Sequence, residues 1–425
     1  MLLKTIKSAS LTAWQYMERY VNRGSESGFD KVNQSLPSFT SAYSEQCCYP
    51  MNVYDCRILK TETLFANDAH DILQPNEFVF HPGNIILSKD NELLRQTLKS
   101  FTLIMETQYT AIPTASSRTV FINNSSDKCL GFLKLHYDGL IGRVNRAITK
   151  QQALSSIELT KVITDAMNKA ILPRDLYFFK EPFAKVVYNG TYEMSYIYRE
   201  LKPYPYDERL KYIIPMFSLF SIDKCAPSDK TLLQQLFEAQ NKPIEDFLLD
   251  KILLPIFKSY FELLLTLGLQ PEWQAQNVLL GIDENYDICG IVFRDLESVD
   301  KDIELMKSLT FYHNKQYPFF ESYDYKCIWY NYRPYTNNSY QIKHSFMFDF
   351  KLCRYLVLPI IEAACSFCHC NKDRLEKVIA EFNQQYLLRL PLDFFPQNCW
   401  YNYANIVLDR SLPRPFIANS DVKFR

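Results

Sequence analysis

Glycine is scarce in this sequence, with 10 occurrences in 425 residues. Average usage in proteins is about 7%, so the deficit is large. Neither of the two common glycine-rich phosphate loops, G-x-x-x-x-G-K-[ST] and G-x-G-x-x-G, occurs in the chain. Those loops hold phosphates with backbone N–H groups. We therefore expect any phosphate site in this protein to be built from side chains.

The chain also lacks an excess of charge, with 47 Lys and Arg against 48 Asp and Glu. A net charge of −1 gives no bulk attraction to nucleic acid or to an anionic membrane surface. No basic run interleaved with aromatics is present, so we expect neither nucleic acid nor a membrane as a partner. The longest apolar segment, 253–267, contains Pro255, Lys258 and Glu262 and is too short to span a bilayer.

A secretory signal peptide is also missing from the start of the sequence. Residues 1–20 include Lys4, Lys7, Glu18 and Arg19, and they contain no sustained apolar segment. We therefore expect a cytoplasmic protein whose 12 cysteines are reduced thiols.

One group of cysteines resembles a cofactor-binding string. Cys365, Cys368 and His369 match the pattern of c-type haem attachment, and Cys370 adds another thiol. Haem attachment of that type requires export, and a zinc site would need a second Cys/His pair elsewhere. We interpret these residues as partly buried thiols on a helix, and metal binding by them is left open.

Polar side chains flank a predicted β-hairpin in the second half of the chain. The apolar runs 278–282 and 288–293 are separated by a polar turn, which predicts two antiparallel strands. The flanking residues are Glu272, Gln274, Gln276 and Asn277 before the first run and Asp295 after the second. Antiparallel pairing brings these ends together. The sequence thus predicts a cluster of oxygen ligands of the kind that holds Mg²⁺ on a nucleotide.

A second cluster carries hydroxyl and basic side chains. Ser116 and Arg118 precede a predicted strand, Lys134 interrupts an otherwise apolar strand, and Arg146 follows. A lysine in an apolar strand must reach solvent or find an anion. Arginine offers a planar fork to phosphate oxygens and lysine a point charge, so these residues could converge on one polyphosphate.

Together the two clusters resemble the aerobactin-synthetase (IucA/IucC) family of siderophore synthetases, which work independently of non-ribosomal peptide synthetases. The family has His-Pro-Trp-Gln, Pro-Thr-x-Ser-x-Arg-Thr, Lys-Leu with a following Arg, and Glu-x-His-x-Gln-Asn with a following Arg-Asp, in that order. The matching residues here are His81 and Pro82; Pro113, Thr114, Ser116, Arg118 and Thr119; Lys134, Leu135 and Arg146; and Glu272, Gln276, Asn277, Arg294 and Asp295. Arg199 and Glu200 also resemble the family's mid-chain Arg-Glu.

The sequence departs from the family pattern in three places. Gly142 stands where the family has a threonine of the phosphate site. Gln274 stands where the family has a histidine that is expected to contact the nucleotide phosphates. Glutamine can donate a hydrogen bond there, but it cannot carry positive charge. The region before His81 is shorter than in typical members, and the early His-Pro-x-x-Lys element is missing.

The resemblance implies a ligase. Family members activate a carboxylate, often of citrate or a derivative, with ATP. An acyl-adenylate forms, pyrophosphate leaves, and an amine or alcohol attacks to give an amide or ester. Arg118, Arg146 and Gln274 are the implied catalytic residues. The implied ligand sets are Ser116, Arg118, Lys134, Arg146, Gln274 and Gln276 for ATP; Glu272, Asn277 and Asp295 for Mg²⁺; and His81 and Arg199 for the substrate.

Two other functions compete with this one. An acid followed by Asn and, after a hairpin, Asp also resembles a kinase-like phosphotransferase, in which Glu272, Asn277 and Asp295 would be the catalytic and metal-binding residues. The replacements at Gly142 and Gln274 also suit a catalytically altered nucleotide-binding homologue. ADP as the product would favour phosphotransfer, and AMP with pyrophosphate would favour adenylation.

We therefore expect a multi-lobed α+β enzyme with ATP in the cleft between a sheet-containing lobe and a mainly helical, palm-like lobe. The expected divisions are a shortened N-terminal region (1–75), a sheet-containing nucleotide-binding lobe (76–205) and a mainly helical lobe (206–425) that carries the hairpin 272–295. Apolar periodicity predicts helices at 91–107, 155–169, 228–240, 243–267, 348–368 and 373–385. The expected partners are a small-molecule carboxylate and an amine or alcohol, and the family often forms homodimers.

Overall fold

Side chains of two paired strands alternate between the buried faces of a sheet. In the computed structural model, β12 (Phe183–Asn189) and β13 (Tyr192–Arg199) form an antiparallel hairpin. Tyr196 packs into one apolar cluster and its neighbour Ile197 into another, as the two-residue period of a strand requires. The structure describes the following residues: 10–22, 36–42, 44–46, 48–66, 72–104, 109–141, 144–240, 242–313, 315, 346–390, 394–395, 400–402, 416–418 and 424–425.

The chain forms two compact units, which are described separately. What we call the sheet unit consists of Gln15–Asp165 and Phe178–Tyr206. What we call the hairpin unit consists of Met1–Trp14, Ala166–Tyr177 and Asp207–Arg425. Neither unit is one continuous stretch of the chain, whereas the sequence predicts three consecutive regions, 1–75, 76–205 and 206–425.

Strands from residues 48–66 are part of the sheet unit's main sheet. Its seven antiparallel strands have the order β1-β6-β7-β8-β13-β12-β3. β1 pairs with β6 at one edge, and β3 pairs with β12 at the other. The remaining bounds are β1 (Tyr49–Pro50), β3 (Lys60–Phe65), β6 (Tyr109–Pro113), β7 (Thr119–Asn124) and β8 (Cys129–Lys134). The region before residue 76 therefore contributes both edge strands of the sheet.

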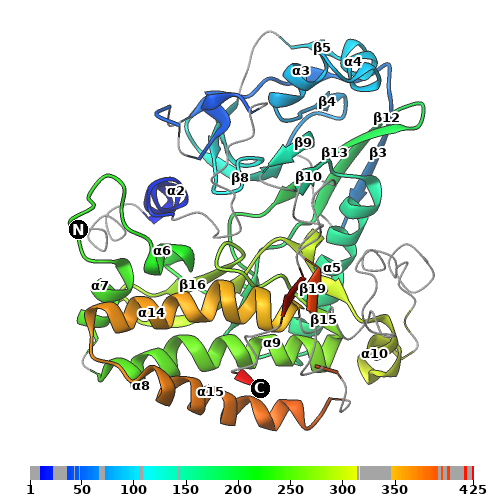
Figure 1. The fold of residues 1–425 in the computed structure, drawn as a ribbon. Helices are drawn as coiled ribbons and strands as arrows, with labels where there is room; N and C mark the ends of the chain where they lie inside the picture. Colours follow the sequence, from blue (N-terminus) through cyan, green and yellow to red (C-terminus); the bar gives the residue numbers. More distant parts are fainter. Residues whose placement is uncertain are drawn as a thin grey trace. The chain divides into compact units, whose positions relative to one another are not determined.

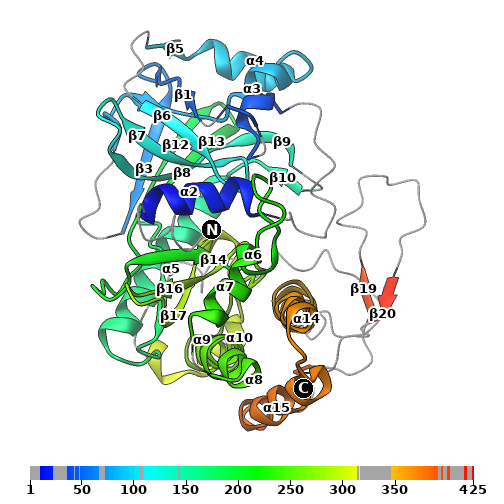
Figure 2. The ribbon, with the colours of Figure 1, turned by 90° about the vertical axis from the view of Figure 1, so that its left-hand side faces the viewer.

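Each face of this sheet is covered by apolar packing. One face shares a core with smaller elements, and α5 (Lys150–Asn168) supplies Ala153 and Ile157 to the core on the other. The elements that share this core are η1 (Ser38–Thr40), β2 (Tyr54–Asp55), β4 (Glu77–Phe78), α3 (Gly83–Leu87) and α4 (Glu92–Lys99). The remaining short elements are α2 (Ser10–Tyr20), β5 (Thr102–Leu103), β9 (Tyr137–Ile141) and β10 (Val144–Arg146). Figures 1 and 2 show these elements with the strands of the sheet.

Helix α5 begins earlier than the sequence pattern predicts. The backbone N–H of Thr149 donates to Oε1 of Gln152 (2.8 Å), and the backbone N–H of Gln152 donates to Oγ1 of Thr149 (3.2 Å). This reciprocal pair is a capping box. Ser155 and Ser156, at the start of the predicted helix 155–169, are of a type that favours N-caps, but they are buried inside the helix. A second predicted helix, 91–107, is shorter in the structure than in the prediction, because α4 ends at Lys99.

The predicted hairpin is confirmed in the other unit. β16 (Val278–Ile282) and β17 (Ile288–Phe293) pair as antiparallel strands within a four-stranded sheet of order β11-β17-β16-β14. β11 is Leu176–Phe178 and β14 is Tyr212–Pro215. A Cβ at Gly290 would lie 2.2 Å from the carbonyl oxygen of Asp175, so one of the few glycines is needed for this close approach.

Helix α9 packs against strand β17 of that sheet, and two helices of this unit begin as π-helix. η2 (Leu249–Leu253) leads into α9 (Leu254–Leu267), and η5 (Phe346–Val357) leads into α14 (Leu358–Phe367). Pro255 and Pro359 follow these π turns; since proline has no N–H, the regular helical bond is lost there. Helices α9, α14 and α15 (Lys372–Leu387) lie alongside one another (Figure 1).

The other elements of the hairpin unit are short. They are α6 (Phe217–Phe220), α7 (Leu232–Glu238), α8 (Ile244–Leu248), β15 (Leu269–Gln270), η3 (Leu296–Ser298), β18 (Asp300–Lys301), α10 (Ile303–Ser308), η4 (Thr310–Tyr312), β19 (Trp400–Asn402) and β20 (Phe416–Ala418). No helix in the described part of the chain is long and apolar enough to cross a membrane.

The expectation that all cysteines are reduced thiols is wrong for one pair. Cys365 and Cys370 form a disulfide, with their Cα atoms 5.2 Å apart. The turn after α14 brings the two residues within the Cα separation that a disulfide needs. Among the described residues, no group of three or more His, Cys, Asp or Glu side chains is placed to hold a metal ion.

Candidate functional site

The open end of the β16–β17 hairpin brings Asn277 and Asp295 next to each other. Val278 lies opposite Phe293 in the ladder, and the N–H of Arg294 donates to the carbonyl of Asn277 at 3.0 Å. The ladder thus continues one residue beyond the strands, and Asp295 follows directly. The antiparallel register therefore places these two predicted metal ligands at one end of the sheet, as the sequence pattern indicates.

A buried tryptophan and local hydrogen bonds fix the turn before β16. Trp273 is fully buried, with its ring about 6 Å from those of Tyr260 (6.0 Å) and Phe293 (5.9 Å). The N–H of Asn277 donates to the carbonyl of Gln274 (2.9 Å), and Nδ2 of Asn277 donates to the carbonyl of Glu272 (3.1 Å). The amide nitrogen of the Asn277 side chain is thereby used within the turn, and its oxygen is the atom suited to a cation.

Glu272 has a different partner from the one that the sequence predicts. Its carboxylate forms an ion pair with Lys351, which lies on the π-helix η5. A carboxylate already paired with a lysine is a poorer ligand for Mg²⁺ than a free one, because the ammonium neutralises part of its charge. The position of Lys351, far along the chain, explains why the sequence pattern did not reveal it.

Two glutamines complete this group. Gln274 is buried, with 8% of its surface exposed, and its assigned contact with ATP stays a prediction. Gln276 is partly buried, and its backbone carbonyl accepts a hydrogen bond from Nε of Arg294 at 3.0 Å. The arginine of the Arg-Asp pair thus holds the main chain of the opposite strand end.

The residues present fit a magnesium ion that shares its ligands with a nucleotide. Mg²⁺ is usually bound by one or two carboxylates, several waters and substrate phosphates. The oxygen of Asn277 and the carboxylate of Asp295 match this need. Asp295 adopts a left-handed backbone (φ 77°), and its Oδ2 accepts a hydrogen bond from the Ser298 hydroxyl at 3.3 Å. We regard these two residues as a better ligand pair than the three that include Glu272.

The second predicted cluster is organised by the turn between β6 and β7. Oγ of Ser116 accepts the N–H of Thr119 at 3.0 Å, and the Thr114 hydroxyl donates to the Thr119 carbonyl at 2.7 Å. Ser117, between the two candidate residues, has a left-handed backbone (φ 61°). The N–H of Ala115 donates to the buried carboxylate of Glu18 at 3.1 Å. Glu18 lies on α2, 97 residues earlier in the chain, and sequence analysis did not find this anchor.

Hydrogen bonds link the segments that carry the three predicted basic residues of this cluster. Lys134, at the end of β8, lies opposite Thr119 in the ladder, and the N–H of Leu135 donates to the carbonyl of Arg118 at 2.9 Å. Nη1 of Arg118 donates to the carbonyl of Arg146 at 2.8 Å. Arg118 and Lys134 are both buried, with 5% and 3% exposed. Two buried cations thus lie at the ends of neighbouring strands, and their binding to the phosphates of ATP stays a prediction.

Two buried histidines face the charge of Arg118. Burial lowers the pKa of His81 to about 3 and that of His136 to about 4, and the charge of Arg118 adds to both shifts. Nδ1 of His81 accepts the N–H of Gly83 at 3.0 Å, and Nδ1 of His136 accepts the N–H of Ile148 at 3.1 Å. Both rings are therefore neutral at pH 7. The role of His81 in substrate binding stays a prediction, and sequence analysis missed His136.

Arg199 is occupied by an internal partner. Its Nε and Nη2 both donate to Oε1 of Glu181, at 2.9 and 2.5 Å, and both side chains are buried. The guanidinium fork that was assigned to a substrate carboxylate thus already binds a carboxylate of the protein. Its contacts support a structural role, and its role towards substrate stays a prediction. Gly142, where the family has threonine, lies outside the described residues.

Comparison with known proteins identifies the fold. No protein-family model matches the sequence, and no curated protein matches it either. Among solved structures, the petrobactin biosynthesis protein AsbB from Bacillus anthracis str. Sterne is similar, with a TM-score of 0.70 and 12% identity over 96% of this chain and 74% of AsbB. ATP-bound aerobactin synthetase IucA from a hypervirulent pathotype of Klebsiella pneumoniae has a TM-score of 0.64 and 13% identity, over 98% of this chain and 80% of IucA.

Aerobactin synthetase IucC from the same pathotype is also similar, with a TM-score of 0.57 and 12% identity over 99% of this chain and 83% of IucC. The chain therefore has a mixed α/β fold of the IucA/IucC type, which confirms at the level of fold the resemblance seen in the motifs.

Proposed function

We propose that this protein is an ATP-dependent siderophore-type synthetase that adenylates a carboxylate and condenses it with an amine or alcohol. The observation that carries the proposal is that hydrogen bonds link the segments of Arg118, Lys134 and Arg146 near the Ser116 turn, in a chain with the fold of the synthetases. The glycine deficit favours a phosphate site made of side chains, and this cluster offers the basic and hydroxyl side chains for one.

The basic cluster would act on the phosphates of ATP. Attack of a carboxylate on the α-phosphate increases the negative charge on the phosphate oxygens, and cations fixed in advance stabilise that charge. Arg118 is fixed by its bond to the main chain of Arg146, and Ser116 by its bond to Thr119. Little reorganisation is then needed during the reaction, so most of the rate enhancement would come from positioning and electrostatics.

The hairpin cluster would bind the metal and part of the nucleotide. Asn277 and Asp295 would hold Mg²⁺, which would neutralise phosphate charge when it is bound. Gln274 would donate a hydrogen bond to a phosphate oxygen through its side-chain amide. Arg294 and Trp273 would keep the strand ends in place through the contacts described above. Glu272 would act indirectly, through its ion pair with Lys351.

The test is to incubate the purified chain with ATP, Mg²⁺ and a panel of carboxylates, with hydroxylamine as the acceptor. We expect hydroxamate to form with at least one carboxylate, together with AMP and pyrophosphate. Citrate and its derivatives are the first carboxylates to try. ADP as the product would overturn adenylation in favour of phosphotransfer.

A catalytically altered homologue is the second candidate. Gln274 in place of histidine and the pairing of Glu272 with Lys351 both favour it, since each reduces the charge available to the nucleotide site. Under this alternative, ATP with Mg²⁺ would raise the melting temperature, but no carboxylate in the panel would yield AMP. The melting and product measurements together distinguish the two functions.

A further inference from the structure

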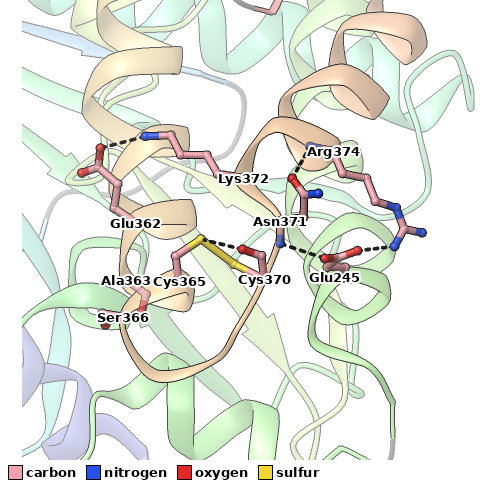
Figure 3. Close-up of a disulfide and its surroundings, with 9 residues drawn as sticks. All are labelled: Glu245, Glu362, Ala363, Cys365, Ser366, Cys370, Asn371, Lys372 and Arg374. Carbon is pink, nitrogen blue, oxygen red and sulfur yellow. Dashed lines mark hydrogen bonds and ion pairs between the residues drawn. A yellow bond between two sulfur atoms is a disulfide. The ribbon is translucent and has the colours of Figure 1, made fainter.

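The turn between α14 and α15 contains three cysteines within six residues. Cys365 lies in the last turn of α14, Cys368 directly follows that helix, and Cys370 precedes Asn371, the N-cap of α15. Figure 3 shows the disulfide between Cys365 and Cys370, which joins the end of α14 to the residue before Asn371. All three cysteines are partly exposed, and Cys368 is a free thiol. A disulfide therefore lies two residues from a thiol that solvent can reach.

Polar contacts also hold this turn. The N–H of Asn371 donates to Oε1 of Glu245 at 2.9 Å, and Arg374 pairs with the same carboxylate. Lys372 pairs with Glu362 at 3.3 Å (Figure 3). The start of α15 thus has non-covalent anchors that do not depend on the disulfide. The helix can keep its position when the sulfur–sulfur bond is broken.

Three features distinguish this bond from a structural disulfide. It joins residues only 5 apart, so it restricts the unfolded chain far less than a long-range link would. Both of its cysteines are partly exposed, and exposed disulfides are typically the labile, exchangeable ones. Among the described residues, the exposed Cys48 and Cys225 are thiols and not disulfides, as expected of a protein from a reducing environment.

We propose that Cys365 and Cys370 form a reversible thiol–disulfide site that exchanges with low-molecular-weight thiols and disulfides. In the oxidising direction, a thiolate of the pair attacks a small disulfide, whose S–S bond breaks, and one small thiolate leaves. The second protein thiolate then attacks the mixed disulfide, forms the Cys365–Cys370 bond and releases the other small thiolate. Two electrons pass from the protein to the small disulfide, and two small thiols form. Reduction is the reverse sequence.

The experiment uses the full chain at several ratios of reduced to oxidised glutathione. Samples are quenched with acid and alkylated with N-ethylmaleimide. Trypsin then releases residues 355–372, which lie between Arg354 and Lys372 and contain all three cysteines. We expect one alkyl group on this peptide under oxidising conditions and three under reducing conditions, with full return when the ratio is reversed. The proposal would be overturned if the peptide carried three alkyl groups at every ratio, or if it carried one alkyl group at every ratio.

A Cys368→Ser variant identifies the pair. Because Cys368 is free in the structure, the variant peptide should change between no alkyl groups and two over the same ratios. Loss of this response would show that Cys368 is a member of the pair and would contradict the assignment. Hydrogen exchange of the wild-type chain gives a further measurement: amides 366–371 should exchange several-fold faster after reduction, while α9 stays protected.

Discussion

Nη1 of Arg118 donates a hydrogen bond to the backbone carbonyl of Arg146 at 2.8 Å, so one predicted phosphate-binding arginine fixes the main chain of the other. The two residues lie 28 positions apart in the sequence and form one structural group. A change at Arg118 should therefore affect two ligands of the proposed ATP site.

Replacing Arg118 should disable this group. We expect Arg118→Ala to reduce exchange of pyrophosphate into ATP by roughly 10²-fold or more, the usual effect of removing a preorganised charge. The exchange rate of Arg118→Lys should lie between those of the wild type and Arg118→Ala, because lysine keeps the charge but lacks the planar guanidinium fork. Arg57→Ala is the matched control, since Arg57 belongs to the same unit and its side chain is 75% exposed. If a folded Arg118→Ala protein kept the wild-type rate of exchange of pyrophosphate into ATP, the assignment of Arg118 to the site would be wrong.

The three predicted metal ligands should differ in their effect on magnesium. Asp295→Asn and Asn277→Ala should raise the Mg²⁺ concentration for half-maximal activity by roughly tenfold or more. Glu272→Gln should change it little, because that carboxylate is paired with Lys351. A magnesium titration of each variant measures these effects. Equal shifts in all three variants would restore Glu272 as a ligand.

Position 274 should control the affinity for ATP. Gln274→His introduces the residue that the family carries, and a protonated imidazole can pair with a phosphate. We expect ATP with Mg²⁺ to bind about fivefold more tightly, or roughly 1 kcal/mol, at pH 6, with a smaller gain at pH 8. Isothermal titration at both pH values measures this. Gln234→His, on α7 in the same unit, is the control and should leave affinity unchanged.

Breaking the Arg199–Glu181 pair should destabilise the fold. Arg199→Met leaves a buried carboxylate without its cation, which costs about 3–5 kcal/mol. The double variant Arg199→Met, Glu181→Leu should lose less stability than the single variant, because it leaves no unpaired charge in the core. Urea unfolding of the set gives the values. If Arg199→Met instead kept full stability and lost binding of the carboxylate substrate, the direct role predicted from sequence would be correct.

Stability should fall on mild acidification because of His81 and His136. Their folded pKa values of about 3 and about 4 lie below the ordinary 6.5, so the unfolded chain binds more protons within that window. The stability that depends on the two neutral histidines is fully present above pH 6.5, and the free energy of unfolding decreases as the pH falls below that value. Between pH 7 and pH 5 we expect a loss of about 2 kcal/mol per histidine. His136→Gln should flatten the profile, whereas His313→Gln, at an exposed position, should not.

The parts of the fold that were predictable are those with local signals. The hairpin 278–293 has two apolar runs and a polar turn, and both strands form at the predicted residues. The start of α5 could also have been predicted from the capping box of Thr149 and Gln152. Ser155 and Ser156, which are also of a cap-forming type, suggested a later start. Local patterns of this kind depend only on neighbouring residues, so a sequence contains them in full.

The parts that were not predictable depend on distant residues. Glu18 holds the Ser116 turn across 97 positions, and Lys351 binds Glu272 from a helix that begins in another part of the chain. Neither residue has a neighbouring pattern that marks it. The pairing of Cys365 with Cys370 likewise depends on where α14 ends, and helix ends are among the least certain features of a sequence-based prediction.

The left-handed backbone of Asp295 has a consequence for attempts to stabilise this protein. Glycine adopts that conformation more easily than any residue with a side chain, so Asp295→Gly would relieve backbone strain. The same substitution would remove the only carboxylate of the proposed Asn277–Asp295 ligand pair. A directed-evolution screen that rewards thermal stability alone would therefore select against the proposed metal site. Such a screen should include a nucleotide-binding step at every round.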